Sequence, residues 1–109
     1  MMGNPRWRYL LVKFLMTDAV SAQRVEQSVR THMEEMLGKV GLSEMKARVL
    51  AVDEQKSTAM LRCDLSAVER LRAVLALMRQ MDGRPVAAFT LRSSGTIKGL
   101  GTKLRQVRR

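Results

Sequence analysis

Alternating apolar and polar positions predict three strands in the first two thirds of the chain. The first covers residues 6–16, and the next two cover residues 45–51 and 58–63, joined by an Asp-Glu-Gln-Lys turn at 53–56. Side chains two positions apart share one face of a strand, so one set in each segment is expected to be buried. The expected inward positions are Leu10, Val12, Phe14 and Met16 in the first strand, and Met45, Ala47, Val49, Ala51, Ala59, Leu61 and Cys63 in the hairpin.

Helical spacing of apolar residues predicts two helices, one after the first strand and one after the hairpin. Ser21 is a suitable N-cap for the first helix, and Gly41 is expected to end it. A Ser-Ala-Val-Glu capping box at residues 66–69 predicts the start of the second helix, which should end near Asp82-Gly83. The two apolar stripes are Val25, Val29, Met33, Met36, Leu37 and Val40 in the first helix, and Val68, Leu71, Val74, Leu75 and Met78 in the second.

A last strand is predicted to open at Pro85 and to be broken by Gly95. After it, residues 96–107 fit a short basic helix interrupted by glycines. The inner face of the strand is expected to carry Ala87, Phe89 and Leu91, and the outer face Ala88, Thr90 and Arg92.

These elements follow the order strand, helix, strand, strand, helix, strand. This βαββαβ order predicts an α+β, ferredoxin-like split-βαβ sandwich, in which two helices cover one face of a four-stranded antiparallel sheet. We expect one domain over residues 1–109, with a basic tail at 93–109 that includes a short C-terminal helix. The first and last strands should be central or adjacent, and the uncovered face should carry Lys13, Arg48, Arg62 and Arg92.

Positive charge is concentrated at the two ends of the chain. The net charge is +10, and residues 84–109 carry seven Lys or Arg but no Asp or Glu. Residues 1–16 carry three basic and no acidic groups, whereas residues 17–83 carry ten of each. A surface of one sign attracts phosphates and gains affinity by releasing counterions, so nucleic acid is the first partner expected and an anionic membrane the second.

Catalysis and metal binding by the chain itself are not expected. One histidine and one cysteine are too few for a Cys/His metal cluster. His32 lies beside the first apolar stripe and is expected to make local contacts, while Cys63 is expected to be a small buried hydrophobic residue. A single cysteine gives no disulfide framework, and the apolar runs are too short to span a membrane, so a soluble cytoplasmic protein is expected.

The segment Gly95-Thr96-Ile97-Lys98-Gly99 lacks the spacing of a P-loop or of a GxxG loop. We expect Gly95 to have a positive φ and Thr96 to cap the next helix, which would direct backbone N–H groups at a phosphate beside Lys98. The third strand has no aromatic residue, so stacking of single-stranded bases on the sheet, as in RRM domains, is not expected. A basic, aromatic-poor surface suits the backbone and shape of folded RNA instead.

Four segments of the sequence, taken in order, resemble one known family. They are Arg8-Tyr9-Leu10-Leu11, Leu61-Arg62-Cys63, the Val68 to Met78 helix and, most specifically, Ser94-Gly95-Thr96-Ile97-Lys98. The chain resembles the ribonuclease P protein component 2 family, the small protein subunit shared by archaeal and eukaryotic ribonuclease P. The resemblance implies a ferredoxin-like fold and a non-catalytic subunit of an archaeal holoenzyme. In that family the RNA subunit removes the 5′ leader of precursor tRNA with Mg²⁺, and the small protein pairs with a larger barrel-shaped protein subunit.

The resemblance and the charge pattern together predict which residues make contacts. RNA contacts are expected at Arg8, Lys13, Arg92, Gly95, Thr96, Lys98, Lys103, Arg105 and Arg108, and contacts with the protein partner at Trp7, Tyr9, Met60 and Arg62. The protein itself would bind no cofactor, because Mg²⁺ enters through the RNA. Precursor tRNA would be an indirect partner, and self-association would occur within a heterotetramer.

Two other readings of the same sequence belong to different functional classes. A ribosomal or other structured-RNA-binding protein of the same fold would co-purify with ribosomal RNA. A homodimeric ferredoxin-like sensing or structural domain would pair through its uncovered sheet face and would show no salt-sensitive RNA binding.

Overall fold

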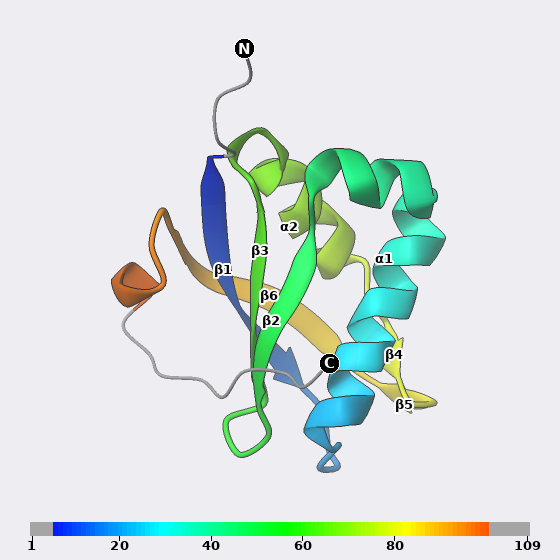
Figure 1. The fold of residues 1–109 in the computed structure, drawn as a ribbon. Helices are drawn as coiled ribbons and strands as arrows, with labels where there is room; N and C mark the ends of the chain where they lie inside the picture. Colours follow the sequence, from blue (N-terminus) through cyan, green and yellow to red (C-terminus); the bar gives the residue numbers. More distant parts are fainter. Residues whose placement is uncertain (1–5, 101–109) are drawn as a thin grey trace.

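In the computed structural model, which describes residues 6–100, two helices pack on one face of a four-stranded antiparallel sheet (Figure 1). The strand order is β2-β3-β1-β6. The main elements are β1 (Trp7–Leu15), α1 (Ala22–Met45), β2 (Arg48–Asp53), β3 (Thr58–Asp64), α2 (Val68–Ala76) and β6 (Ala87–Ser94). The predicted βαββαβ, ferredoxin-like arrangement is confirmed, and β1 is a central strand adjacent to β6.

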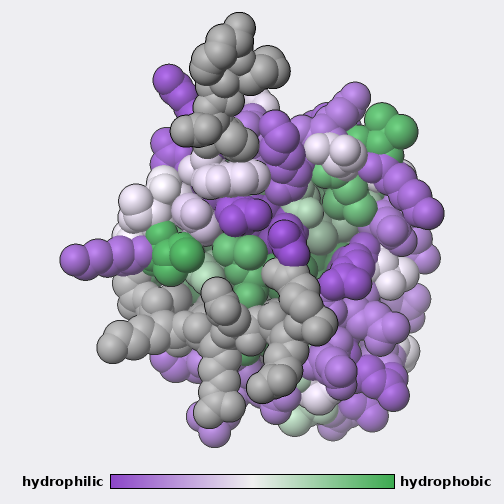
Figure 2. All heavy atoms as spheres, in the orientation of Figure 1, coloured by the Kyte–Doolittle hydropathy of each residue, from purple (hydrophilic) through white to green (hydrophobic). Residues whose placement is uncertain are grey.

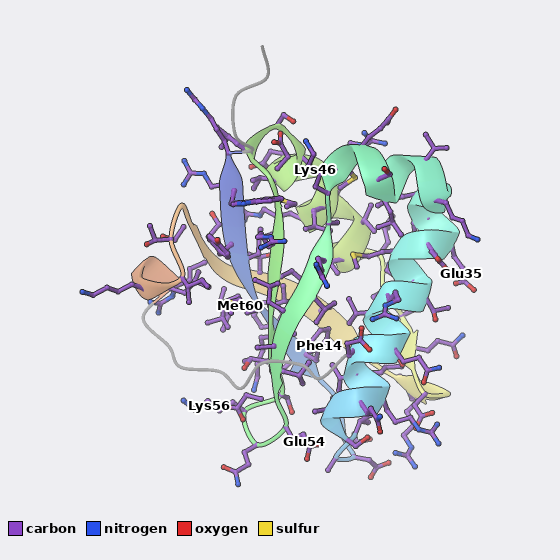
Figure 3. All side chains as sticks on the ribbon, in the orientation of Figure 1. Phe14, Glu35, Lys46, Glu54, Lys56 and Met60 are labelled. Carbon is purple, nitrogen blue, oxygen red and sulfur yellow. The ribbon has the colours of Figure 1, made fainter. Side chains whose placement is uncertain are left out.

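The main core lies between the sheet and the helices and takes its side chains from alternate positions of the two central strands. Six of these side chains are at most 1% exposed: Leu10, Val12, Phe14, Ala59, Leu61 and Cys63. Figure 3 shows Phe14 between the sheet and α1. Burying a large apolar side chain completely contributes about 1.5–3 kcal/mol, so this layer fixes which face of β1 and β3 points toward the helices. The prediction for these two strands is confirmed.

Both edge strands contain an irregularity that changes their faces. In β2 the register shifts between Val49 and Ala51, so Ala51 joins a cluster on the far side of the sheet. In β6 the pairing skips Leu91, because Thr90 pairs with Val12 and Arg92 pairs with Leu11. A bulge places two residues opposite one and reverses the alternation beyond it.

The predicted faces of the last strand are therefore wrong up to the bulge and right after it. Ala88 is 7% exposed and packs in the core, whereas Phe89 and Leu91 are 42% and 48% exposed. The predicted uncovered-face positions of Lys13, Arg48, Arg62 and Arg92 are confirmed by the register, since Arg48 pairs with Arg62 and Arg92 with Leu11.

Helix α1 starts as predicted but breaks at a different glycine. The Ser21 hydroxyl accepts a hydrogen bond from the Arg24 amide at 3.3 Å, and the Glu54 carboxylate in the β2–β3 turn accepts one from the Ala22 amide at 2.5 Å. Gly38 has φ 72° and ψ 170°, a region open almost only to glycine. The chain then resumes helical turns to Met45, so the expected stop at Gly41 is wrong.

The break also changes the apolar stripe of α1. Val25, Val29 and Met33 are at most 2% exposed, whereas Met36 and Val40 are 44% and 71% exposed. The predicted stripe is correct to Met33 and at Leu37, which packs against the core, and wrong at Met36 and Val40. After the break the buried positions are Gly41 and Met45.

The second helix is capped by a different residue from the one predicted. Asp64 accepts a hydrogen bond from the Ser66 amide at 3.0 Å and starts the short 3₁₀ helix η1 (Leu65–Ala67). Helix α2 follows directly, and its N-cap residue Ala67 makes no side-chain hydrogen bond. The predicted Ser66 capping box is thus wrong, because the Ser66 amide and hydroxyl both donate to the Asp64 carboxylate, which caps the 3₁₀ turn.

Between α2 and β6 lies a short hairpin that was not predicted. Helix α2 ends at Ala76, and β4 (Gln80–Met81) pairs with β5 (Arg84–Pro85). Asp82 and Gly83 have φ values of 54° and 77°, the two successive positive values that a tight hairpin turn requires. Pro85 therefore ends β5 and does not open the last strand.

Candidate nucleic-acid interface

The sheet face that points away from the helices is called the open face here, and its residues form three rows across the strands. Each row takes one residue from β2, β3, β1 and β6 in turn, according to the backbone register. The rows are Arg48–Arg62–Tyr9–Ser94, then Ala51–Met60–Leu11–Arg92, then Asp53–Thr58–Lys13–Phe89. Residues far apart in the sequence, all but one from predicted strands, thus meet on one surface.

The middle row is covered by a segment that follows β6. The 3₁₀ helix η2 (Lys98–Leu100) lies on the side of the sheet away from α1 and α2 (Figure 1). Leu100 is 0% exposed and packs with Leu11, Ala51 and Met60, which are at most 6% exposed. The Arg92 guanidinium donates a hydrogen bond to the Leu100 carbonyl at 3.0 Å. The expectation of an uncovered face is wrong at its centre.

Figure 2 shows a group of hydrophobic side chains over the strands, with mostly hydrophilic side chains above it. Met60, labelled on the strand side in Figure 3, belongs to the buried cluster under Leu100. Met60 was predicted to contact a protein partner, but it is not accessible to one while η2 covers it.

The other three residues predicted to contact a protein partner lie together in or beside the first row, that of Arg48, Arg62, Tyr9 and Ser94. The Arg62 guanidinium lies over the Trp7 ring, 4.0 Å from its centroid, and Tyr9 is the direct β1 partner of Arg62. A guanidinium stacked on an aromatic face is attracted by the ring electrons and held in one orientation. These side chains form a partly buried cluster at the start of β1.

The segment after β6 is organised by hydroxyl groups and by a close glycine contact. The Thr96 amide donates to Ser94 Oγ at 3.2 Å, and the Gly99 amide donates to Thr96 Oγ1 at 3.0 Å. The predicted cap at Thr96 is confirmed, but these two amides are satisfied within the segment. A β-carbon on Gly99 would lie 2.0 Å from Ser94 Oγ and 3.0 Å from Ser94 Cβ, so a larger residue would force the Ser94 side chain to move.

The backbone of Gly95 differs from the prediction, and Gly95 lies close to Arg8. Gly95 is not among the glycines with positive φ in the described part of the chain, which are Gly38 and Gly83, so that expectation is wrong. The Arg8 guanidinium lies 3.5 Å from the position that a Gly95 β-carbon would occupy. Arg8 and Gly95, predicted separately, are therefore neighbours.

The remaining cations predicted to contact RNA lie in different surroundings. Lys13 donates to the Lys56 carbonyl in the β2–β3 turn at 2.6 Å, and Lys98 is exposed at the start of η2. Lys103, Arg105 and Arg108 lie outside the described residues, as does most of the predicted C-terminal helix.

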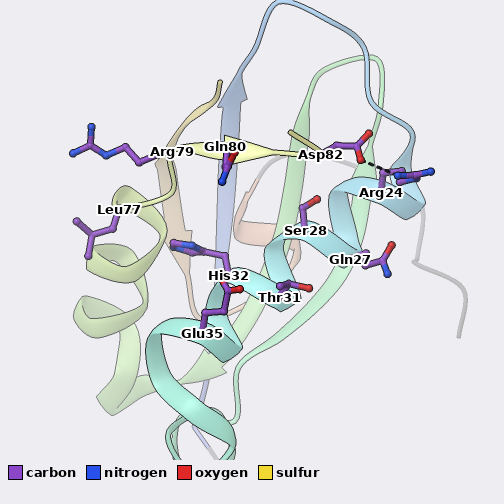
Figure 4. Close-up of a pocket in the computed structure, with 10 residues that line it drawn as sticks. All are labelled: Arg24, Gln27, Ser28, Thr31, His32, Glu35, Leu77, Arg79, Gln80 and Asp82. Carbon is purple, nitrogen blue, oxygen red and sulfur yellow. Dashed lines mark hydrogen bonds and ion pairs between the residues drawn. The ribbon is translucent and has the colours of Figure 1, made fainter. Parts of the chain in front are cut away.

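Ion pairs in the described part of the chain lie away from the open face. They join Arg24 to Asp82 at 2.8 Å, Arg84 to Asp18 at 3.6 Å, and Arg30 to Glu26 within α1. A groove of about 500 Å³ lies beside α1, on the helix side of the sheet (Figure 4). Its lining includes Arg24, Asp82, Glu35 and His32, so it has no single sign of charge.

His32 and Cys63, the two residues considered as catalytic or metal-binding candidates, are held inside the fold by packing and hydrogen bonding. His32 Nε2 lies 2.7 Å from the Val74 carbonyl and so links α1 to α2. Cys63 is fully buried, and desolvation, with a smaller effect from Asp64, raises the pKa of its thiol to about 11. The Asp64 pKa is lowered by its hydrogen bonds from Ser66. Residues 6–100 include no cluster of three or more metal-binding side chains, and no helix among them is long and apolar enough to cross a membrane.

The fold and this surface define a ferredoxin-like α+β protein with a cation-rich sheet face. A sequence model of the Rpp14/Pop5 family matches residues 8–105, and the chain belongs to that family. The predicted resemblance is thereby confirmed.

Relatives with curated names agree with the family match. The chain is 30% identical over 96 residues to ribonuclease P protein component 2 of Pyrococcus horikoshii, covering 88% of this chain and 80% of that protein. It is 27% identical over 99 residues to the protein of the same name in Methanosarcina mazei, covering 91% and 84%. A chain in a structure of yeast ribonuclease MRP superposes with a TM-score of 0.66 at 16% identity, covering 88% of this chain and 79% of that one. At that identity the similarity shows a shared fold.

Proposed function

We propose that this protein is a non-catalytic subunit of ribonuclease P that binds and stabilises the catalytic RNA during removal of the 5′ leader from precursor tRNA. The observation that carries the proposal is the family match over residues 8–105, which includes every strand of the open face except the first residue of β1. Archaeal relatives named ribonuclease P protein component 2 support an archaeal holoenzyme, and we propose the cytoplasm as its location.

Electrostatics gives this subunit a physical role that needs no catalytic side chain. Folding an RNA brings phosphates together, and a protein that presents several cations lowers that repulsion and releases counterions. Arg48, Arg62, Arg92 and Lys98 supply charge from the described residues, and Lys103, Arg105 and Arg108 add to it in the sequence. Mg²⁺ would be held by the RNA, with the protein reducing the concentration required.

The partners follow from the same proposal. They are the ribonuclease P RNA, a larger barrel-shaped protein subunit and, indirectly, precursor tRNA, with self-association in a heterotetramer. Ile97, Phe89 and Leu91 are 42–48% exposed and offer apolar area on or near the open face for a protein contact.

Affinity purification of the full chain from its own cells at moderate salt, followed by sequencing of the bound RNA, tests the function. Enrichment of ribonuclease P RNA together with a second protein supports the proposal. Ribosomal RNA alone would favour a general structured-RNA-binding protein of the same fold, and a homodimer with no RNA would favour a sensing or structural domain.

A further inference from the structure

We propose that Arg48 and Arg62 form a preorganised phosphate-binding pair on the open face that holds the backbone of the bound RNA. This inference rests on the proposed function and names the RNA contact of two residues in the first row. The two arginines are direct cross-strand partners on β2 and β3. Directly opposed side chains have β-carbons about 4.5–5.5 Å apart, so both guanidinium groups can reach one phosphate or two successive ones.

The pair is not neutralised within residues 6–100. None of the ion pairs or side-chain hydrogen bonds there includes Arg48 or Arg62. Asp64 is the nearest acid by register, opposite Trp7, and its carboxylate is occupied by the amide and hydroxyl of Ser66. Two like charges directly opposite each other in a sheet are destabilising, and an anion bound between them would remove that repulsion.

Arg62 is already held in one orientation before any ligand arrives. Its guanidinium stacks on Trp7 at 4.0 Å, and its buried Nε has no hydrogen-bond partner in the described region. Stacking uses the flat face of the guanidinium, and because Nε is buried, the two terminal NH₂ groups are the donors left for a ligand. Because less rotamer entropy is lost on binding, such an arginine suits bidentate recognition of phosphate.

RNA fits this pair better than an acidic protein segment does. Arg92 lies on the same face in β6, and Lys98 lies at the start of η2, so several cations share this side of the sheet and a polyanion can contact more than one of them. Trp7 and Tyr9 flank the pair with aromatic surface, on which a neighbouring base can stack. The contact would be with the backbone and would not depend on base sequence.

The test compares full-length variants in binding to ribonuclease P RNA over a range of salt concentrations. Arg48→Ala/Arg62→Ala removes both cations, and Arg48→Ala alone removes only the exposed one, which leaves the Arg62–Trp7 stack intact. Arg72→Ala, at an exposed position on α2, is the matched control. Losing two phosphate contacts should lower the salt slope by about 1.4–1.8 and the affinity at 0.1 M salt by about 25- to 60-fold. Losing one should lower the affinity by about 5- to 8-fold.

Trp7 gives an independent readout, because it is the only tryptophan in the chain. RNA binding at the pair should change Trp7 fluorescence in the wild type and in Arg72→Ala. If wild-type and control proteins bind RNA but the variants keep their affinity and slope, the inference is wrong while the proposed function stands. If the variants keep RNA affinity and lose a protein partner in affinity purification, the pair is a protein contact and the inference is also overturned. Failure of the wild type to bind the RNA at all would contradict both proposals.

Discussion

Replacing Leu100 by Ala tests whether η2 is docked on the open face in solution. Leu100 is 0% exposed and covers Leu11, Ala51 and Met60. Truncation to Ala removes three carbon atoms from this contact, and each buried methylene contributes about 0.8 kcal/mol. Buried Leu→Ala changes lower stability by about 2–5 kcal/mol, with the larger losses where a cavity persists. Since η2 connects to the sheet through one short segment, it can shift to close the gap, and we expect about 2–3 kcal/mol.

The measurement is urea denaturation of the full chain, with Leu100→Ala compared with Ile97→Ala. Ile97 lies one turn earlier and is 45% exposed, so its truncation should change the free energy of unfolding by less than about 0.5 kcal/mol. The melting temperature of Leu100→Ala should fall by roughly 10 °C for a domain of this size. Equal and small effects for the two variants would refute the docking of η2 on the sheet.

Other perturbations test separate features. Gly38→Ala should lower the free energy of unfolding by about 1–3 kcal/mol, because φ 72° with ψ 170° is strained for any residue with a side chain. Gly83→Asn in the hairpin turn is the control and should change the free energy of unfolding little. A Gly38→Ala variant as stable as the wild type would mean that the helix does not break there. Cys63 should react slowly with iodoacetamide at pH 8, because burial raises its pKa to about 11. The thiol of the unfolded chain, with a pKa near 9.0, ionises at lower pH than the folded thiol, so the contribution of Cys63 to stability should decrease as pH rises from about 9 to about 11. The Cys63→Ala protein should lose less stability over this pH range. Rapid alkylation of the native wild-type protein would contradict the burial of Cys63. Lys98→Ala combined with Lys103→Ala should raise the Mg²⁺ requirement of the ribonuclease P holoenzyme more than it lowers the rate at saturating Mg²⁺, and an unchanged Mg²⁺ profile in a cleavage assay would exclude this role.

The central strands could be predicted from the sequence, whereas the faces of the edge strands could not. Alternation is continuous in the parts of β1 and β3 that pack against the helices, so each apolar position there identifies the core face. In β2 and β6 the irregularities fall at Leu50 and Leu91, ordinary apolar residues that also fit an unbroken alternation. No local sequence signal marks them, because the register there is set by pairing with the neighbouring strand.

The helix break shows the same limit for glycine. Gly38 and Gly41 are one turn apart, and either could end a helix by sequence alone. A β-carbon on Gly41 would lie 3.1 Å from Leu37 Cβ, whereas one on Gly38 would meet nothing within 4 Å. Close packing against Leu37 thus favours glycine at position 41, whereas the backbone angles favour glycine at position 38. This distinction depends on the folded chain.

The candidate site was predicted in its residue types but not in its arrangement. The strand pattern placed Arg48, Arg62 and Arg92 on one face, and the structure confirms that placement. The covering of that face by Leu100 depends on a contact between residues about 40 to 90 positions apart in the sequence, which no local pattern encodes. The stack of Arg62 on Trp7 likewise joins two strands.

The difference in charge between the helices and the open face has a kinetic consequence. The two helices carry five acidic and five basic residues, whereas the rows of the open face carry four cations and one acid, Asp53. The described part of the chain therefore has an electric dipole whose positive end is the open face. In the field of a nearby polyanion this dipole experiences a torque, so the protein turns its sheet toward the ligand during diffusion. A larger fraction of encounters then begins in a productive orientation, and the advantage decreases as added salt shortens the range of the field.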